Sequence, residues 1–398
     1  MDVLAYNAWM LPPVADDRVA RAQVIPAALE GYDVVVVSEL FDREAREVFA
    51  EGMRNVGYAE TPVLGEDAPE RCDSSFGPIH MSVELGLNGG VMIFGKHRVT
   101  ETAERVFREM RGVDEETEGP ACVGEDCCSA KGVRYVRFET DGVGIPECLH
   151  VFGTHLQNQT PVVGAVRRAN GDAPRLARSR QLRMIRELID EVADTESCPG
   201  PVIVAGDLNL QPSELDEALS ILDAAGPDFA GPPSWGSFNH HAESDAPEHL
   251  DYVLVTGDWE APLLATNETR LVRGTYERSL GLGILGRTEE VFADLSDHHA
   301  VAGRFEWAST SARARIRWRV GASECGPEAQ PVDAGELTPS GGALCAEGEL
   351  GEAIWCDRGL SGCAEGRRCA QVVDPSSSEP TAFDDYLCWG QPRQSFQR

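Results

Sequence analysis

Hydrophobic residues gather in short runs along the chain, separated by longer segments in which they recur every three or four positions. The short runs are rich in Val, Ile and Phe and have the length of buried strands. We expect strands at 3–6, 34–37, 90–94, 133–138, 149–153, 202–205, 252–255 and 300–305. Three longer segments have the apolar spacing of amphipathic helices, at 18–30, 43–56 and 176–192. Many strands with few helices predict two packed sheets flanked by helices, an α+β or α/β sandwich.

The third expected helix has the clearest pattern. Its apolar positions form one stripe, made of Leu176, Leu182, Ile185, Leu188 and Ile189. Arginines stand between them, so we expect the stripe to be buried and the arginines to lie on the opposite face.

The composition of the chain changes after Trp307. Arg, Ser and Ala come first, followed by a segment rich in Cys, Gly, Glu and Ser with few large hydrophobic residues. A chain of 398 residues is also long for a single domain. We therefore predict a main domain over 1–307 and a small cysteine-rich region over 308–398.

Half of the 12 cysteines lie in this tail. Because the tail has too few apolar residues for a large core, we expect disulfides to stabilise it. For Cys122, Cys127 and Cys128 we also favour disulfides, with zinc binding as the alternative. Disulfides indicate an oxidising compartment, so we expect a secreted or extracellular protein whose signal peptide has been removed. A cytosolic protein with free thiols is the alternative.

Acidic residues dominate the charge: 66 Asp and Glu stand against 35 Lys and Arg, a formal net charge of -31. Nucleic-acid binding needs cations that neutralise phosphates, so a nonspecific DNA or RNA binder is disfavoured. No run approaches the ~20 apolar residues of a membrane helix, so we expect no transmembrane segment. This charge either has a functional role or serves only to keep the protein soluble.

Polar residues repeatedly stand at the ends of the expected strands. These residues are Asn7, Glu39, His155, Asp207, Asn209, Asp251, Asp297 and His298. Any one of these residues, taken by itself, has an ordinary explanation as a turn or capping residue. Together they are better explained by a rigid scaffold that presents them to one cleft.

Around these positions the sequence resembles a known family. The motifs are Ser-Glu-Leu-Phe-Asp (38–42), Asn-Gly-Gly-Val-Met-Ile (88–93), Gly-Thr-His-Leu-Gln (153–157), Gly-Asp-Leu-Asn (206–209), His-Leu-Asp-Tyr (249–252) and Ser-Asp-His-His (296–299). They resemble the endonuclease/exonuclease/phosphatase superfamily and, within it, the bacterial neutral sphingomyelinases, which are secreted Mg-dependent phospholipases C. The resemblance runs from about residue 3 to 306. It implies a catalytic domain with the DNase I-like four-layer α/β/β/α sandwich, and it leaves the C-terminal extension unassigned.

The resemblance also implies a cation site. Glu39 would be the principal metal ligand, with Asn7 and Asp297 on the same cluster. Asp207 would orient the attacking water or a second cation, and Asn209 would hydrogen-bond the phosphate. Oxygen ligands suit Mg²⁺ better than Zn²⁺, and Mn²⁺ or Co²⁺ are alternatives.

Two histidines complete the expected machinery. We expect His298 to be the general base, because an imidazole pKa of about 6.5 lies near the operating pH. Asp251 would hold its tautomer through the other ring nitrogen. His155 would stabilise the transition state or protonate the leaving alkoxide. Four further histidines are expected either to be structural or to support the site residues from behind: His240, His241, His249 and His299.

Two features bear on the substrate. In the family, the segment before the Asp-His pair forms a membrane-contacting hairpin with exposed aromatics. Here that segment, 279–287, has no aromatic residue, and the side chains available to insert are Leu280, Leu282, Ile284 and Leu285. A glycine-rich active-site loop is the alternative. Trp235 is a candidate wall for a quaternary ammonium headgroup through a cation–π contact, with a core tryptophan as the alternative.

The sequence therefore predicts a Mg²⁺-dependent phosphodiesterase that hydrolyses sphingomyelin, or a related choline lipid in a membrane surface, to ceramide and phosphocholine. One alternative is another phosphoesterase on the same fold, either a nuclease or a soluble phosphatase. The other is a catalytically weak lipid-binding module. No motif identifies a protein partner.

Overall fold

The computed structural model describes the chain in segments, namely 1–12, 14–66, 87–107, 120–140, 146–159, 172–193, 197–198, 200–237, 239–242, 244, 246–256, 264–280, 287–306 and the strands of the tail. It divides into two compact units, Met1–Trp307 and Ala308–Arg398. Within these described segments, no helix is both long enough and apolar enough to cross a membrane.

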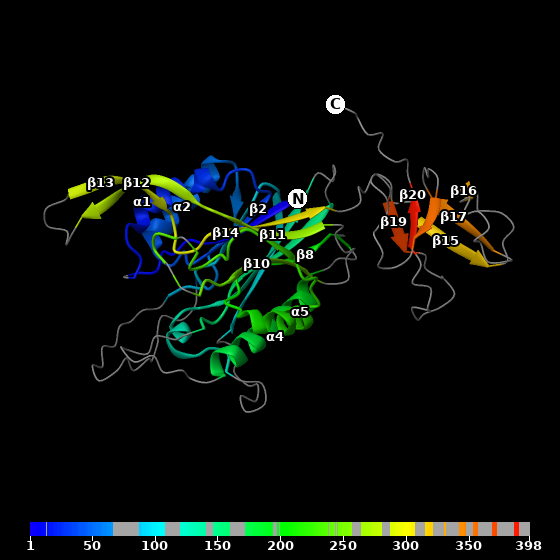
Figure 1. Cartoon of the computed structure of the whole chain (residues 1–398), viewed down its shortest axis with the longest axis horizontal. Helices are drawn as coiled ribbons and strands as arrows, with labels where there is room; N and C mark the ends of the chain where they lie inside the picture. Colours follow the sequence, from blue (N-terminus) through cyan, green and yellow to red (C-terminus); the bar gives the residue numbers. More distant parts are fainter. Residues whose placement is uncertain are drawn as a thin grey trace. The chain divides into compact units, whose positions relative to one another are not determined.

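Two sheets form the centre of the first unit (Figure 1). One has the strand order β3-β4-β2-β1-β14-β11-β9 and the other the order β10-β8-β7-β6-β5. The strands of the first sheet are β1 (Asp2–Asn7), β2 (Val34–Ser38), β3 (Ala59–Glu60), β4 (Met92–Gly95), β9 (Asp228–Ala230), β11 (Leu264–Arg270) and β14 (Ala300–Glu306). Those of the second are β5 (Arg98–Val106), β6 (Gly132–Glu139), β7 (Cys148–His155), β8 (Val202–Asp207) and β10 (Asp251–Thr256).

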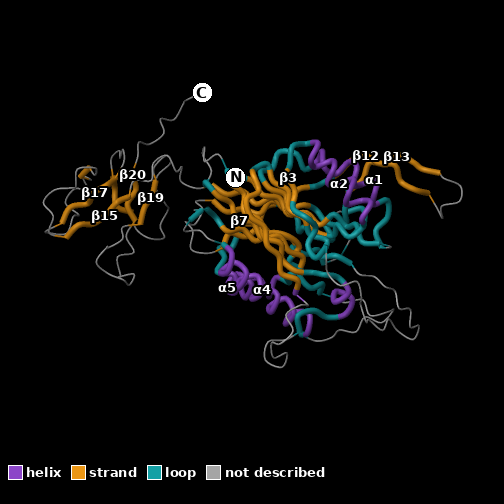
Figure 2. Tube along the Cα trace, turned by 180° about the vertical axis from the view of Figure 1, so that it is seen from behind, coloured by secondary structure: helices purple, strands orange, loops and turns teal. Residues whose placement is uncertain are grey.

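Helices cover the outer face of each sheet, and Figure 2 shows the two pairs on opposite sides of the strands. The helices are α1 (Arg18–Ala28), α2 (Arg43–Asn55), α4 (Ala173–Val192) and α5 (Leu215–Leu222), with short 3₁₀ turns at Gly124–Cys128 and Pro212–Glu214. A hairpin of β12 (Arg273–Leu280) and β13 (Arg287–Asp294) packs beside α1.

Three hydrophobic clusters fill the spaces between these four layers. The central cluster lies between the sheets and includes Val36 and Ile203. A second joins the first sheet to α1 and α2 and includes Phe49. A third joins the second sheet to α4 and α5 and includes Ile185. Burial of apolar area on both faces of each sheet is the main stabilising term here. The predicted DNase I-like α/β/β/α sandwich is confirmed.

The structure contains all eight predicted strands and all three predicted helices, but the prediction for the helix over 176–192 is partly wrong. In α4 the side chain of Leu176 is 39% exposed, whereas Arg178 and Arg180 are each only 3% exposed. Arg178 forms a buried pair with Glu214, with 2.7 Å between Nη2 and Oε1. The reason is tertiary packing, because α5 and the turn before it cover a second face of α4. On that face the arginine side chains are buried and Arg178 pairs with a carboxylate, where we had expected contact with solvent.

Two disulfides join early cysteines: Cys122 pairs with Cys127, and Cys148 pairs with Cys198. The zinc alternative for Cys122 and Cys127 is therefore wrong, and none of the described cysteines is free.

The second unit contains two three-stranded sheets that the sequence did not predict. Their strand orders are β15-β17-β16 and β18-β20-β19. The strands are β15 (Arg315–Val320), β16 (Gln330–Pro331), β17 (Gly342–Glu347), β18 (Ala353–Cys356), β19 (Arg368–Gln371) and β20 (Tyr386–Trp389). We expected disulfides in this tail, but its cysteine side chains lie outside the part of the chain that the structure describes.

Candidate active site

Strand register brings the predicted polar residues together. In the first sheet β1 and β2 are parallel with Asn7 opposite Ser38, so Glu39 leaves β2 beside Asn7. In the second sheet Asp207 lies opposite both His155 and Asp251. Since the two sheets pack face to face, the polar residues of the first sheet and those of the second lie at the same edge of the sandwich.

The Asn7 side chain links the two sheets. Its Nδ2 donates to Glu39 Oε1 at 3.1 Å and to Asp207 Oδ2 at 3.0 Å. Its orientation is fixed by the backbone N–H of Trp9, which donates to Asn7 Oδ1 at 3.0 Å. From the segment before β14, Ser296 Oγ donates to the carbonyl of Asn7 at 2.6 Å, which brings in the neighbouring Asp297.

A cavity of about 360 Å³ opens over this cluster. Its lining includes six of the eight predicted polar residues, while Asn7 and Asp251 stand behind them. The lining residues are Glu39, His155, Asn158, Gln159, Asp207, Asn209, Trp235, Glu248, Leu250, Asp297 and His298.

Three carboxyl groups of the cluster are buried and interact with neighbouring charges. Burial, with Asp297 nearby, raises the pKa of Glu39 to about 7. Burial, with Asp251 nearby, raises the pKa of Asp207 to about 7. Burial also raises the pKa of Asp297. Desolvation and mutual repulsion thus penalise the ionised forms, and a divalent cation among these oxygens would remove the penalty. The donor set fits a hard cation such as Mg²⁺.

His298 and Asp251 form a hydrogen-bonded pair. His298 Nδ1 donates to Asp251 Oδ2 at 2.7 Å, and both side chains are buried. This bond leaves His298 Nε2, which lies 3.9 Å from Asp207 Oδ2, as the nitrogen that faces the cavity. Burial alone would lower the pKa of His298, but the charges of Asp251 and Asp297 outweigh it and raise this pKa well above its usual value.

Ligand atoms of Asp207, Asp251 and His298 also lie within 4.8 Å of one another, close enough to surround an ion. A metal there would compete with the 2.7 Å hydrogen bond between His298 and Asp251. By chemistry, the carboxylates of Glu39, Asp207 and Asp297 suit Mg²⁺ better than a set that includes imidazole. Their ligand atoms are not, however, the ones that lie within 4.8 Å of one another among the described residues.

His155 lies on the other side of Asp207, with 3.6 Å between His155 Nε2 and Asp207 Oδ2. The same nitrogen lies 3.1 Å from Nζ of Lys131, a buried residue that the sequence reasoning missed. Lys131 Nζ also donates to the carbonyl of Leu156 at 2.9 Å and to Asp126 Oδ2 at 3.0 Å. Burial and the charges of Lys131 and His298 lower the pKa of His155 well below its usual value. His155 is therefore neutral, and its Nε2 accepts from Lys131.

Replacing Lys131 with methionine should lower kcat by about 10–100-fold, the usual cost of losing a group that orients a catalytic side chain. Since the ammonium depresses the pKa of His155, we also expect this pKa to rise in the variant. A pH–rate profile of the variant measures both effects. The chain contains only one other lysine, Lys96, so Lys96→Met is the matched control. Its Nζ lies over the Tyr58 ring, 5.2 Å from the centroid. Equal activity of the two variants would contradict the role of Lys131.

The backbone is unusual where two of these side chains leave it. Glu39 and Asn209 have left-handed conformations, with φ of 62° and 49°. Such conformations are costly for residues other than glycine and cluster at functional sites. Gly206, just before Asp207, has φ 138°, and a Cβ there would lie 2.0 Å from the carbonyl oxygen of Thr154. Only glycine permits this close approach of β7 and β8.

Of the residues expected to recognise substrate, Trp235 lies in the cavity. It is half-buried, and its backbone forms bridges with Glu248 and with His298. The prediction for the hairpin falls mostly outside the described residues. Leu280 ends β12, whereas Leu282, Ile284 and Leu285 lie in the undescribed segment 281–286.

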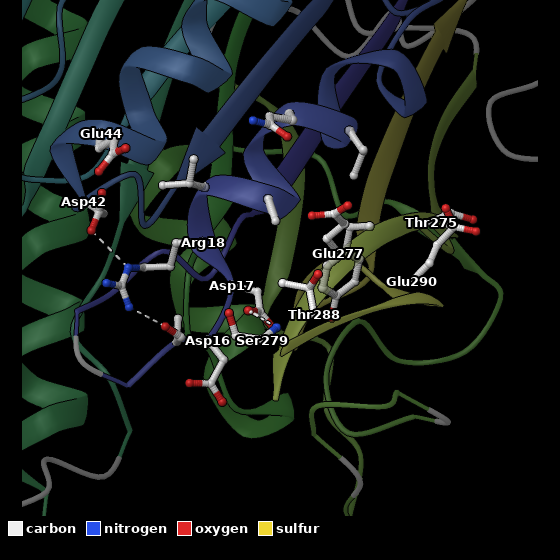
Figure 3. Close-up of a pocket in the computed structure, with 16 residues that line it drawn as sticks. Asp16, Asp17, Arg18, Asp42, Glu44, Thr275, Glu277, Ser279, Thr288 and Glu290 are labelled. Atoms are coloured by element: carbon white, nitrogen blue, oxygen red, sulfur yellow. Dashed lines mark hydrogen bonds and ion pairs between the residues drawn. The ribbon is translucent and has the colours of Figure 1, made fainter. Parts of the chain in front are cut away.

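A larger cavity, of about 800 Å³, lies elsewhere, between α1 and the β12–β13 hairpin (Figure 3). Its acidic lining residues are Asp16, Asp17, Asp42, Glu44, Glu277 and Glu290, and Arg18 is bound to Asp42 at 3.0 Å. The hairpin is held there by Ser279, whose N–H donates to Asp17 Oδ1 at 3.0 Å. None of the predicted catalytic residues lines this cavity, so size alone does not locate the active site.

The comparison with protein families agrees with this geometry. The model of the Endonuclease/Exonuclease/phosphatase family matches residues 4–298, which include all eight polar residues of the site. The chain belongs to this family.

Similar members of the family are bacterial sphingomyelinases. A sphingomyelinase C of Leptospira interrogans is 28% identical over 274 residues, covering 64% of this chain and 44% of the relative. One from Bacillus cereus is 26% identical over 289 residues, covering 67% of this chain and 78% of the relative. The chain thus spans less than half the length of the Leptospira relatives that it matches.

Solved structures show the same family fold. Sphingomyelinase C from Streptomyces griseocarneus is 26% identical with a TM-score of 0.58, covering 77% of this chain and 99% of that chain. A mutant of beta toxin from Staphylococcus aureus, with bound magnesium ions, is 24% identical with a TM-score of 0.59 and covers 77% and 99% of the two chains. The resemblance predicted from the motifs is confirmed.

Proposed function

We propose that this family member is a divalent-cation-dependent phosphodiesterase that hydrolyses sphingomyelin to ceramide and phosphocholine by in-line attack of water. The observation that supports this most strongly is one cavity with two facing parts. On one side is the His298–Asp251 pair, whose Nε2 faces the cavity, and on the other are the carboxylates of Glu39, Asp207 and Asp297. The charges of Asp297 and Asp207 help to raise the pKa of His298, so a cation that neutralised them would lower this pKa and let Nε2 accept a proton.

The cation would be held by Glu39 and Asp297, with Asn7 and Asp207 beside them, and Mg²⁺ fits these oxygens best. Mn²⁺ or Co²⁺ are alternative occupants. When bound, the cation neutralises phosphate charge and lowers the barrier to attack. The magnesium in the beta toxin structure is consistent with this choice.

The protein's own groups would then move the protons. His298 Nε2 accepts a proton from the attacking water, and Asp251 stabilises the imidazolium that forms. Asp207, 3.9 Å from His298 Nε2, orients the water. Asn209 donates to a phosphate oxygen from its amide. His155, held neutral beside Lys131, accepts from Lys131 at Nε2 and therefore carries its proton on Nδ1. Nδ1 has no partner among the described residues, so it is the nitrogen left to donate to the charge that develops on the leaving oxygen.

The substrate class is proposed from the names of the relatives and from the cavity lining. Sphingomyelinases C of Leptospira interrogans and Bacillus cereus are among the similar proteins. Trp235 and Glu248 form a pair of backbone hydrogen bonds, each 3.0 Å long, and both line the cavity. Since directly opposite residues of paired strands face the same side, their side chains offer an aromatic face and a carboxylate next to each other. This combination suits a quaternary ammonium group.

Sphingomyelin vesicles test the proposal directly. We expect phosphocholine release in the presence of Mg²⁺, its loss with EDTA, and its return when Mg²⁺ is added in excess. A matched reaction with supercoiled plasmid should show no nicking, because the net charge of -31 repels polyanions. Plasmid nicking without lipid hydrolysis would favour the nuclease alternative. Lipid binding without turnover would favour the binding-module alternative.

We also propose that the protein acts outside the cell. Assaying the culture medium of the producing cells for the activity tests this.

The headgroup site gives a separate prediction. Replacing Trp235 with leucine should raise KM for p-nitrophenyl phosphocholine by about 5–30-fold, because a cation–π contact contributes about 1–2 kcal/mol in a partly desolvated site. Glu248→Gln should change KM in the same direction. Bis(p-nitrophenyl) phosphate, which has no cation, should be hydrolysed at the wild-type rate by both variants. Phe229→Leu is the control, because Phe229 is exposed and lies outside the cavity lining. An equal loss on both substrates would show that the changes act on the reaction centre.

A further inference from the structure

Arg21 is a charged side chain in the interior of the first unit. It belongs to α1 and is 0% exposed. Burial lowers its pKa, and no carboxylate among the described residues forms an ion pair with it. A buried cation without such a partner costs free energy, and an apolar side chain of similar length would pack there without that cost.

The partners of Arg21 are backbone carbonyls. Its Nη1 donates to Ala8 at 3.0 Å and to Leu295 at 2.8 Å. Its Nη2 donates to Trp9 at 2.7 Å, and its Nε donates to Asp16 at 3.0 Å. The guanidinium also lies over the Trp9 ring, 5.0 Å from the centroid. Only a guanidinium offers donors in this planar, fork-like arrangement.

The bonded carbonyls belong to the two segments that carry the cation site. Ala8 and Trp9 directly follow Asn7, and the N–H of Trp9 sets the orientation of the Asn7 amide. Leu295 directly precedes Ser296, whose hydroxyl donates to the carbonyl of Asn7 at 2.6 Å and accepts from the His298 N–H at 3.1 Å. One Arg21 nitrogen thus joins the exit of β1 to the entry of β14.

We propose that Arg21 is a positioning residue that holds these two segments together, so that Asn7 and Asp297 form one cation site and His298 faces it. This inference rests on the proposed function, because it takes the carboxylate cluster to be the site of the divalent cation. Arg21 touches neither the substrate nor the cation. Its effect is transmitted through the carbonyls of Ala8, Trp9 and Leu295.

Arg21→Lys tests the proposal, because lysine keeps the charge but not the planar fork. We expect the Mg²⁺ concentration for half-maximal activity to rise about 10–100-fold, with kcat lowered and KM for p-nitrophenyl phosphocholine unchanged. A measurement independent of turnover is the rise in Tm on adding Mg²⁺, which should shrink. Arg134→Lys is the matched control, since Arg134 is also buried and donates to the carbonyl of Val63, away from the site.

A merely structural Arg21 would give a different result. The variant would then have a lower Tm but the wild-type Mg²⁺ dependence and the wild-type kcat per folded molecule, which would overturn the proposal. If Arg21→Lys does not fold, Trp9→Leu replaces it, because Trp9 is only half-buried and its ring packs on the guanidinium. An unchanged Mg²⁺-induced rise in Tm in that variant would overturn the proposal equally. If the wild type binds Mg²⁺ without hydrolysing sphingomyelin, the proposed function fails while the Tm measurements still decide the role of Arg21.

Discussion

Replacing His298 with alanine should lower kcat for sphingomyelin by about 10²–10⁴-fold, the usual contribution of a positioned general base. The side chain is buried on the cavity wall, Asp251 holds its Nδ1 at 2.7 Å, and its Nε2 faces Asp207. Without it, the attacking water has no acceptor for its proton. The measurement is kcat on vesicles at saturating Mg²⁺, with binding followed separately by vesicle sedimentation, which should not change.

Asp251→Asn provides a sharper test of the same pair. The amide has nearly the same shape but can donate to His298 Nδ1, which favours the tautomer that carries its proton on Nε2. We expect a loss on the order of 10⁴-fold, as the wrong tautomer causes in an aspartate-oriented catalytic histidine.

The control for both variants is His97→Ala. His97 follows β4 just beyond Gly95, which pairs with Val34 at the start of β2, whereas Glu39 follows the end of that strand. It therefore lies at the opposite end of the sheet from the site. If the His298 and Asp251 variants keep the activity of the His97 variant, the pair has no role as a base.

The positions of these residues could be predicted because local and global signals agree. A run such as Val34–Ser38 is hydrophobic at four consecutive positions, as a strand buried on both faces must be. A carboxylate directly after such a strand has no place in the core, so it marks the strand end. A polar residue likewise ends β8 at Asp207 and β1 at Asn7. The parallel pairing of β1 with β2 and of β7 with β8 aligns these strand ends with Glu39 and His155.

Lys131 could not be predicted, because its role depends on tertiary contacts. It precedes β6, and its sequence neighbours show neither a motif nor a periodicity. Only packing against His155 and Asp126, which lie on other segments, gives it a function. The sole signal is compositional, since one of only two lysines stands between two small residues at the start of a buried strand.

Strands without a hydrophobic signal were missed for a similar reason. β5 alternates between exposed and half-buried positions over most of its length, because it lies at the edge of its sheet. Such an edge strand needs few apolar residues and is recognised only through its partner, β6.

Removing divalent cations should make the stability of the protein fall as pH rises. The pKa of Glu39 is raised from 4.5, and that of Asp207 from 3.8, to about 7. Below the ordinary pKa of each group, the carboxyl is protonated in both the folded and the unfolded state, so the free energy of unfolding does not depend on it. Between that value and about 7 the unfolded chain releases its proton more readily, so the folded state loses stability progressively. His155, whose pKa is lowered, has the opposite effect at pH values below its ordinary pKa of 6.5. Because two carboxyl groups oppose this one histidine, thermal unfolding in EDTA should show Tm falling through this range.

Excess Mg²⁺ should reverse this trend, because it binds the ionised carboxylates of the folded state. At a Mg²⁺ concentration 100 times Kd the gain is about 2.7 kcal/mol. Tm should then no longer decrease between about pH 5 and 7.

Glu39→Gln connects this stability effect to catalysis. The variant has one buried carboxyl group fewer, so its Tm in EDTA should depend less on pH, and Mg²⁺ should raise it less. Glu39 is a proposed direct ligand of the cation. Its loss should therefore lower activity at least as much as the loss of a residue that only hydrogen-bonds to a ligand, by about 100-fold. Glu268→Gln makes the same charge change on the exposed surface, where Glu268 pairs with Arg270, and should retain the wild-type response. If Mg²⁺ stabilises Glu39→Gln as strongly as the wild type, the cation is held elsewhere, and the Asp207–Asp251–His298 group becomes the site to test next.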